Sequence, residues 1–140
     1  MKRRTFLISS AAALSVWSLL GCGSDKPRSL ILADGTGTVH NRAVDARAKV
    51  FEKKTGRSVR ILLVDGPQAV LLASRGEADV AIVPFDMSID SFIAGEHGRV
   101  AGQLANGGER LKVLEVDAKF HPKVDAKGAK DLAAALITPP

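Results

Sequence analysis

The sequence predicts a single three-layer α/β lobe, in which a mostly parallel sheet of about four strands carries helices on both faces. Three observations lead to this prediction. Short runs rich in Val, Ile and Leu recur along the chain, and this is the composition of strands buried in a parallel sheet. Segments of helical length, with apolar residues at helical spacing, separate these runs. Gly, Pro or Asp follows most of the runs and predicts where each strand ends.

The first 21 residues are predicted to be a signal peptide outside the fold. A basic segment, residues 2–4, precedes an apolar run, residues 6–20, which is short for a membrane span. The Leu-Leu-Gly-Cys sequence at 19–22 fits the pattern at which bacterial lipoprotein signals are cut, so Cys22, the only cysteine, is the expected lipidation site. Residues 3–7 also resemble a twin-arginine signal, and an ordinary basic segment is the alternative. We expect an exported protein, lipid-anchored to a bacterial membrane and facing the periplasm or the cell exterior.

Beyond the signal, residues 22–28 are predicted to form a tether and residues 29–140 the lobe. Cleavage would leave 17 Lys and Arg against 15 Asp and Glu, and the net charge would fall from +5 to +2. Because charges of both signs are interleaved, nucleic acid is not an expected partner. No cofactor is predicted.

The elements before the centre of the chain follow from local patterns. Residues 29–33 form the first predicted strand, and the polar loop 34–38 follows it. Residues 41–54 form a helix that presents Val44, Ala48 and Phe51 to the sheet at helical spacing, with Val50 as a further candidate.

The centre of the chain is predicted to be a parallel βαβ unit. Residues 58–64 form a strand buried on both faces, residues 68–75 a helix, and residues 78–83 a second strand. Open α/β sheets bind ligands at loops that leave the carboxyl ends of strands, so we expect a ligand near residues 65–68.

The remaining third of the chain is predicted to hold fewer elements. A helix covers residues 86–94, a Gly-rich loop residues 95–110, a strand residues 111–116 and a final helix residues 125–137. Two histidines, His97 and His121, are expected to be isolated and solvated.

Three segments together resemble the substrate-binding lipoproteins of tungstate- and molybdate-type ABC transporters. They are residues 30–38 (LILADGTGT), residues 48–83, which contain FEKKTG and RGEADV, and residues 111–136. The resemblance implies one lobe of a type II periplasmic-binding-protein fold, a small oxyanion as solute and an ABC permease as partner. It places the ligand on two loops, at Asp34, Gly35, Thr36, Gly37 and Thr38 and at Asp65, Gly66 and Gln68.

The chain departs from this family in two ways. Family members have two lobes, whereas the place of the second lobe is here reduced to residues 99–110. The hydroxyl-rich loop of the family retains Thr36, and Pro67 removes an N–H group from the second loop. Asp34 and Asp65 add negative charge, which at about 5 Å would cost a bound anion roughly 3 kcal/mol each. These changes argue against tight oxyanion binding.

Three aspartates, Asp34, Asp65 and Asp86, follow the three apolar strands and are expected at one edge of the sheet. Together they suggest a site for a metal cation or a hydroxyl-rich neutral ligand, with His40 as a further nitrogen ligand. The alternative is that each aspartate caps a helix or stabilises a turn.

An enzyme is not predicted, because the sequence lacks a nucleophile elbow, HExxH, CxxC and a phosphate loop. Two functions stay open. One is a membrane-tethered, one-lobe solute-binding protein of the ABC-importer type. The other is an interaction or regulatory module derived from such a lobe. A single lobe can also form a homodimer with a cleft between two copies.

Overall fold

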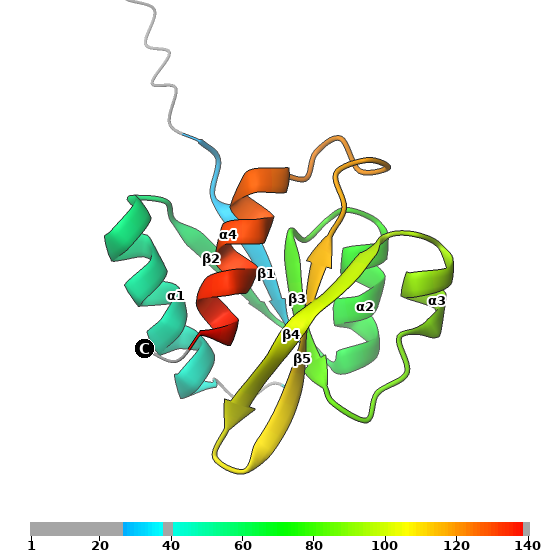
Figure 1. The fold of residues 1–140 in the computed structure, drawn as a ribbon, viewed down its shortest axis with the longest axis horizontal. Coiled ribbons are helices and arrows are strands. Elements are labelled where there is room, and N and C mark those ends of the chain that lie inside the picture. Colours follow the sequence, from blue (N-terminus) through cyan, green and yellow to red (C-terminus); the bar gives the residue numbers. More distant parts are fainter. Residues whose placement is uncertain (1–26, 38–40, 139–140) are drawn as a thin grey trace, which may run out of the picture.

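The computed structural model describes residues 27–37 and 41–138. Within them, the elements in chain order are β1 Leu30–Asp34, α1 Arg42–Thr55, β2 Val59–Leu63, α2 Gly66–Ser74, β3 Val80–Pro84, α3 Asp90–Ala94, β4 Gly98–Asn106, β5 Glu109–Val116 and α4 Ala126–Ile137. Helices α1 and α4 cover one face of a five-stranded sheet and α2 and α3 cover the other (Figure 1). The predicted α/β class, with helices on both faces, is confirmed.

The sheet has the strand order β2-β1-β3-β5-β4. Strand β1 is parallel to β2 and β3, whereas β5 is antiparallel to both β3 and β4. The antiparallel β4–β5 hairpin corrects the prediction of a loop over residues 95–110. Gly107 and Gly108 form its two-residue turn with φ of 55° and 96°, the left-handed backbone that a tight hairpin needs.

Strand β2 lies at an edge of the sheet, so the prediction that it is buried on both faces is wrong. None of its residues is fully buried, and Leu63 is 40% exposed. Strand β3 lies in the middle of the sheet and is buried from Val80 to Val83, as its apolar composition predicts. Apolar composition alone does not tell an edge strand from a central one.

The helix ends follow capping chemistry. The Asn41 side chain accepts hydrogen bonds from the first turn of α1, and Gly56, in the left-handed conformation at φ 71°, ends that helix. The predicted inward positions Val44, Ala48 and Phe51 of α1 are buried, whereas the further candidate Val50 is 39% exposed and lies outside this buried face. Helix α3 is shorter than predicted; its N-cap residue, Ile89, makes no side-chain hydrogen bond, and Asp90 N donates to Ser88 Oγ at 3.4 Å.

The predicted signal peptide and Cys22 lie outside the described residues. Among the residues that are described, no helix combines the length and the apolar character that crossing a membrane requires.

Candidate functional site

The carboxyl edge of the sheet is the edge at which β1, β2 and β3 end, and the predicted ligand loops meet there. Gly35 N donates to Ile82 O at 2.8 Å, and Val64 N donates to Asp34 O at 3.0 Å. A Cβ atom at Gly35 would lie 2.7 Å from Ile82 O and 2.8 Å from the Ala69 side chain. The loops after β1, β2 and β3 are therefore packed against each other, and Gly35 allows this close approach.

The first predicted loop is held by its own carboxylate. Asp34 is 1% exposed, and its Oδ1 accepts hydrogen bonds from Thr36 N at 3.1 Å and Thr36 Oγ1 at 2.6 Å. Its buried Oδ2 has no hydrogen-bond partner. Gly37 follows at φ 121°, and Thr38 lies outside the described residues. Both donors of Thr36 are thus already used within the turn.

The second predicted loop is likewise satisfied internally. Asp65 caps α2 by accepting a hydrogen bond from Gln68 N at 2.8 Å, and Pro67 has no N–H to offer. Gly66 is buried beneath Met87, whose Sδ would lie 2.8 Å from a Cβ atom at Gly66. The N-terminus of α2 is therefore capped and covered, unlike the open helix N-termini that bind anions.

The three aspartates do not assemble as a cation site. Asp34 stabilises a turn, Asp65 caps a helix and Asp86 is exposed. Across residues 27–37 and 41–138, no group of three or more His, Cys, Asp or Glu side chains is placed to hold a metal ion. His40, the additional predicted ligand, lies outside these ranges.

A cavity of about 380 Å³ opens at the carboxyl edge, and we call it the carboxyl-edge cavity. Its lining residues come from the loops after β1 and β3 and from the β4–β5 hairpin: Thr36, Pro84, Phe85, Asp86, Glu109, Arg110 and Leu111. Thr36 and Asp86 were predicted as site residues, whereas the contribution of the hairpin was missed. The Asn106-Gly107-Gly108 sequence is the hairpin signal that could have revealed it.

Arg110 is the positively charged residue in the lining of the carboxyl-edge cavity. Its guanidinium lies 4.2 Å from the centroid of the Phe85 ring, and Phe85 N donates to Arg110 O at 3.1 Å. No carboxylate forms an ion pair with Arg110 in the described part of the chain. Lys112, close by, donates instead to Met87 O at 2.9 Å. Arg110 is thus held in place and remains free to bind an anionic group.

The opposite, amino edge of the sheet, where β1 and β3 begin, contains a buried carboxylate. Asp79 is 1% exposed and accepts hydrogen bonds on Oδ1 from Arg28 at 2.5 Å and Asp125 N at 3.1 Å. Its Oδ2 accepts from Arg28 at 2.9 Å and Ile31 N at 2.8 Å. The hydrogen bond with Asp79 raises the pKa of Arg28 above its ordinary value.

Asp125 extends this network to α4. It caps the helix by accepting from Gly128 N at 2.8 Å, and it pairs with Arg57 at 2.7 Å. These two interactions, the backbone hydrogen bond first, hold the pKa of Asp125 below its ordinary value. The network joins the start of β1, the start of β3 and the first turn of α4.

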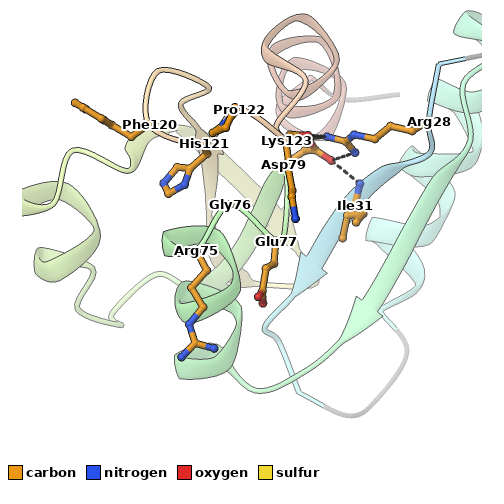
Figure 2. A pocket seen from close by; sticks show the side chains of 10 residues that line it. All are labelled: Arg28, Ile31, Arg75, Gly76, Glu77, Asp79, Phe120, His121, Pro122 and Lys123. Atoms are coloured by element: carbon orange, nitrogen blue, oxygen red, sulfur yellow. Dashed lines mark hydrogen bonds and ion pairs between the residues drawn. The ribbon is translucent and has the colours of Figure 1, made fainter.

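A cavity of about 530 Å³ lies beside this network, and we call it the amino-edge cavity (Figure 2). It is lined by Arg28, Ile31, Arg75, Gly76, Glu77, Asp79, Phe120, His121, Pro122 and Lys123. The prediction that the two histidines are isolated is wrong, because His97 Nδ1 and His121 Nε2 are 3.1 Å apart. His121 packs on Gly76, where a Cβ atom would lie 2.7 Å from the His121 side chain.

No protein-family model and no curated protein matches the chain. Solved structures do resemble it. A conserved protein of unknown function from Vibrio parahaemolyticus aligns with a TM-score of 0.69 and 13% identity, over 80% of this chain and 95% of that chain. The LysR substrate-binding domain of a putative periplasmic protein from Wolinella succinogenes aligns with a TM-score of 0.56 and 14% identity, over 79% of this chain and 95% of that chain.

The tungstate-binding protein TupA from Desulfovibrio alaskensis aligns with a TM-score of 0.48 and 24% identity, over 56% of this chain and 31% of that chain. This chain therefore matches about a third of the length of TupA. At these identities the likenesses concern the fold alone. The chain has a mixed α/β fold similar to the lobes of periplasmic binding proteins.

Proposed function

We propose that this protein is an extracytoplasmic solute-binding module, tethered to the membrane through a lipidated Cys22, that binds a small anionic solute in the carboxyl-edge cavity. The observation that carries the proposal is Arg110, a cation that forms no ion pair with a carboxylate of the described residues and lies at the edge where open α/β sheets bind ligands. The fold supports a binding role, and an ABC permease is the partner that the sequence resemblance suggests.

The charges of the cavity narrow the class of solute. Arg110 favours a carboxylate or another oxyanion, since a guanidinium forms two parallel hydrogen bonds with such groups. Asp86 and Glu109 line the same cavity and would repel a compact dianion such as tungstate. A solute with one anionic group and several N–H or O–H donors fits this lining, because the anionic group can bind Arg110 and the donors can bind Asp86 and Glu109. Amino acids and hydroxy acids belong to this class.

Thermal unfolding of the full-length, membrane-extracted protein tests the proposal. The panel contains tungstate, molybdate, sulfate, phosphate, amino acids, hydroxy acids and divalent cations. A ligand at 100 times its dissociation constant adds about 2.7 kcal/mol to the free energy of unfolding and raises the Tm by the order of 10 °C. We expect such a rise with a hydroxy acid or an amino acid.

Two variants assign the ligand to the cavity. Arg110→Gln removes the cation, and we expect it to lower the ligand-induced rise in Tm by more than half. Arg60→Gln is the matched control, because Arg60 is exposed on the edge strand β2, far from the carboxyl edge. An equal rise in wild type and Arg110→Gln would refute the assignment of Arg110.

The second candidate function is an interaction module that has lost its solute. It is favoured because the hydrogen-bond donors of the two predicted ligand loops are already bound within the protein: Thr36 donates to Asp34, and Gln68 N at the start of α2 donates to Asp65. Absence of a Tm rise with every compound of the panel would leave this candidate as the better one, and co-purification of a protein partner under mild extraction would then support it.

A further inference from the structure

The loop between β5 and α4 carries an apolar side chain that the fold does not bury. Phe120 is 50% exposed, more than any other large hydrophobic side chain of the described residues. Figure 2 shows its ring directed away from the other residues of the amino-edge cavity. Lys119, its neighbour, places Nζ 4.9 Å from the centroid of the ring. Exposed Phe side chains near Lys or Arg occur on surfaces that lie in a membrane interface.

The amino-edge cavity adjoins Phe120 and supplies further cations. Of its two carboxylates, Asp79 is already paired with Arg28, which leaves Glu77 as the only unpaired one in the lining. Arg75 and Lys123 form no ion pair within the described ranges. The lining therefore has a small excess of positive charge, and it also includes the apolar residues Phe120 and Pro122. This combination fits a phosphate group attached to an apolar body.

The path of the chain places this edge near the expected lipid anchor. Arg28 is fixed to Asp79 at the amino edge, and Cys22 precedes it by six residues. A chain of that length spans at most about 20 Å. The carboxyl edge lies at the far ends of β1 and β3, so the amino edge is the one that a lipid on Cys22 would hold against the membrane.

We propose that the amino edge is a membrane-contact surface, with Phe120 in the bilayer interface and the amino-edge cavity occupied by the headgroup of an anionic phospholipid. This proposal rests on the lipid tether of the proposed function. The lipid on Cys22 supplies the affinity, and the contact at Phe120 supplies the orientation, with the carboxyl-edge cavity facing away from the bilayer. The small charge excess of the lining makes the aromatic contact the larger part of the interaction.

Tryptophan fluorescence of the lipidated protein in vesicles tests the proposal. The only tryptophan, Trp17, lies in the predicted signal, so Phe120→Trp introduces a single tryptophan into the mature chain. We expect phospholipids with brominated acyl chains to quench this tryptophan at least twofold. The half-exposed position of Phe120 makes the exchange compatible with folding.

The control variant is Leu63→Trp, because Leu63 is 40% exposed and ends β2 at the carboxyl edge. Its fluorescence should not be quenched. Equal quenching of both variants, or of neither, would overturn the proposed orientation.

The mass of the purified protein reports lipid attachment independently. An unmodified Cys22 would refute the tether and the contact together, whereas lipidation without quenching at position 120 would refute the contact alone.

The role of the lipid headgroup is tested by comparing the quenching in vesicles with and without anionic lipid. In vesicles with a third of anionic lipid, we expect stronger quenching of Phe120→Trp than in purely zwitterionic vesicles. Adding Lys123→Gln should remove most of this difference. Adding Arg42→Gln, which neutralises an exposed cation at the start of α1 near the carboxyl edge, should leave it unchanged. An unchanged difference with Lys123→Gln would refute the headgroup site.

Discussion

Asp79 joins three segments that are distant in the sequence, and its removal should be the most damaging single change at the amino edge. In Asp79→Ala the backbone N–H groups of Ile31 and Asp125 lose their acceptor, and Arg28 loses its ion-pair partner. An unsatisfied buried donor costs about 1–3 kcal/mol. The Arg28 side chain is 42% exposed, so the loss of its ion pair adds less than about 1 kcal/mol. We expect a total loss of about 3–5 kcal/mol.

Urea unfolding followed by circular dichroism measures this loss. Asp131→Ala is the matched control, because Asp131 pairs with Lys127 on the surface of α4, where the two side chains are 44% and 87% exposed. That variant should lose about 0.5 kcal/mol or less. Asp79→Asn keeps one carbonyl oxygen and should lose about half as much as Asp79→Ala, which also provides a measurable variant if Asp79→Ala does not fold. A loss below 1 kcal/mol for Asp79→Ala would refute the reasoning.

Two further predictions concern Asp125 and Gly35. The pKa of Asp125 is lower in the folded chain than its ordinary value, so its contribution to stability is present above pH 4 and is lost as the pH falls through the folded-state pKa. Asp125→Asn, which keeps the cap on Gly128 N, should therefore lose less stability than wild type as the pH is lowered from about 4 in urea titrations, and equal losses would contradict this. Gly35→Ala should cost about 1–3 kcal/mol in the same assay, because its Cβ would meet Ile82 O at 2.7 Å; an unchanged unfolding midpoint would show that the carboxyl-edge loops are less tightly packed than described.

Much of the fold could be predicted from the sequence because its strongest signals are local. The apolar spacing of α1 and α4 and the buried composition of β3 each follow from one segment alone. Strand β4 was missed because its glycines resemble loop residues. Gly98 lies against Phe92 and the Glu115 backbone, and Gly102 lies against Ile137. These glycines serve close packing between elements, which only the three-dimensional structure reveals.

The candidate site was harder to predict than the fold. The sequence correctly places Thr36 and Asp86 at the carboxyl edge, since parallel strands bring their ends together. Arg110 could not be assigned to that edge without the β4–β5 hairpin, because its position depends on the antiparallel register of Pro84 with Leu111. The pairing of His97 with His121 likewise depends on contacts between two loops that lie 24 residues apart in the chain.

The β4–β5 hairpin also explains how one lobe can carry a cavity by itself. The sequence resemblance places the second lobe of a binding protein at residues 99–110, and this stretch instead forms β4, the hairpin turn and the start of β5. Glu109 and Arg110 then supply the wall that a second lobe would otherwise provide. Such a wall is shallow and does not close over a ligand, so water reaches Arg110 and weakens its attraction for an anion. Under the proposed function, this form suits an abundant solute at a high dissociation constant rather than the scavenging of a trace oxyanion.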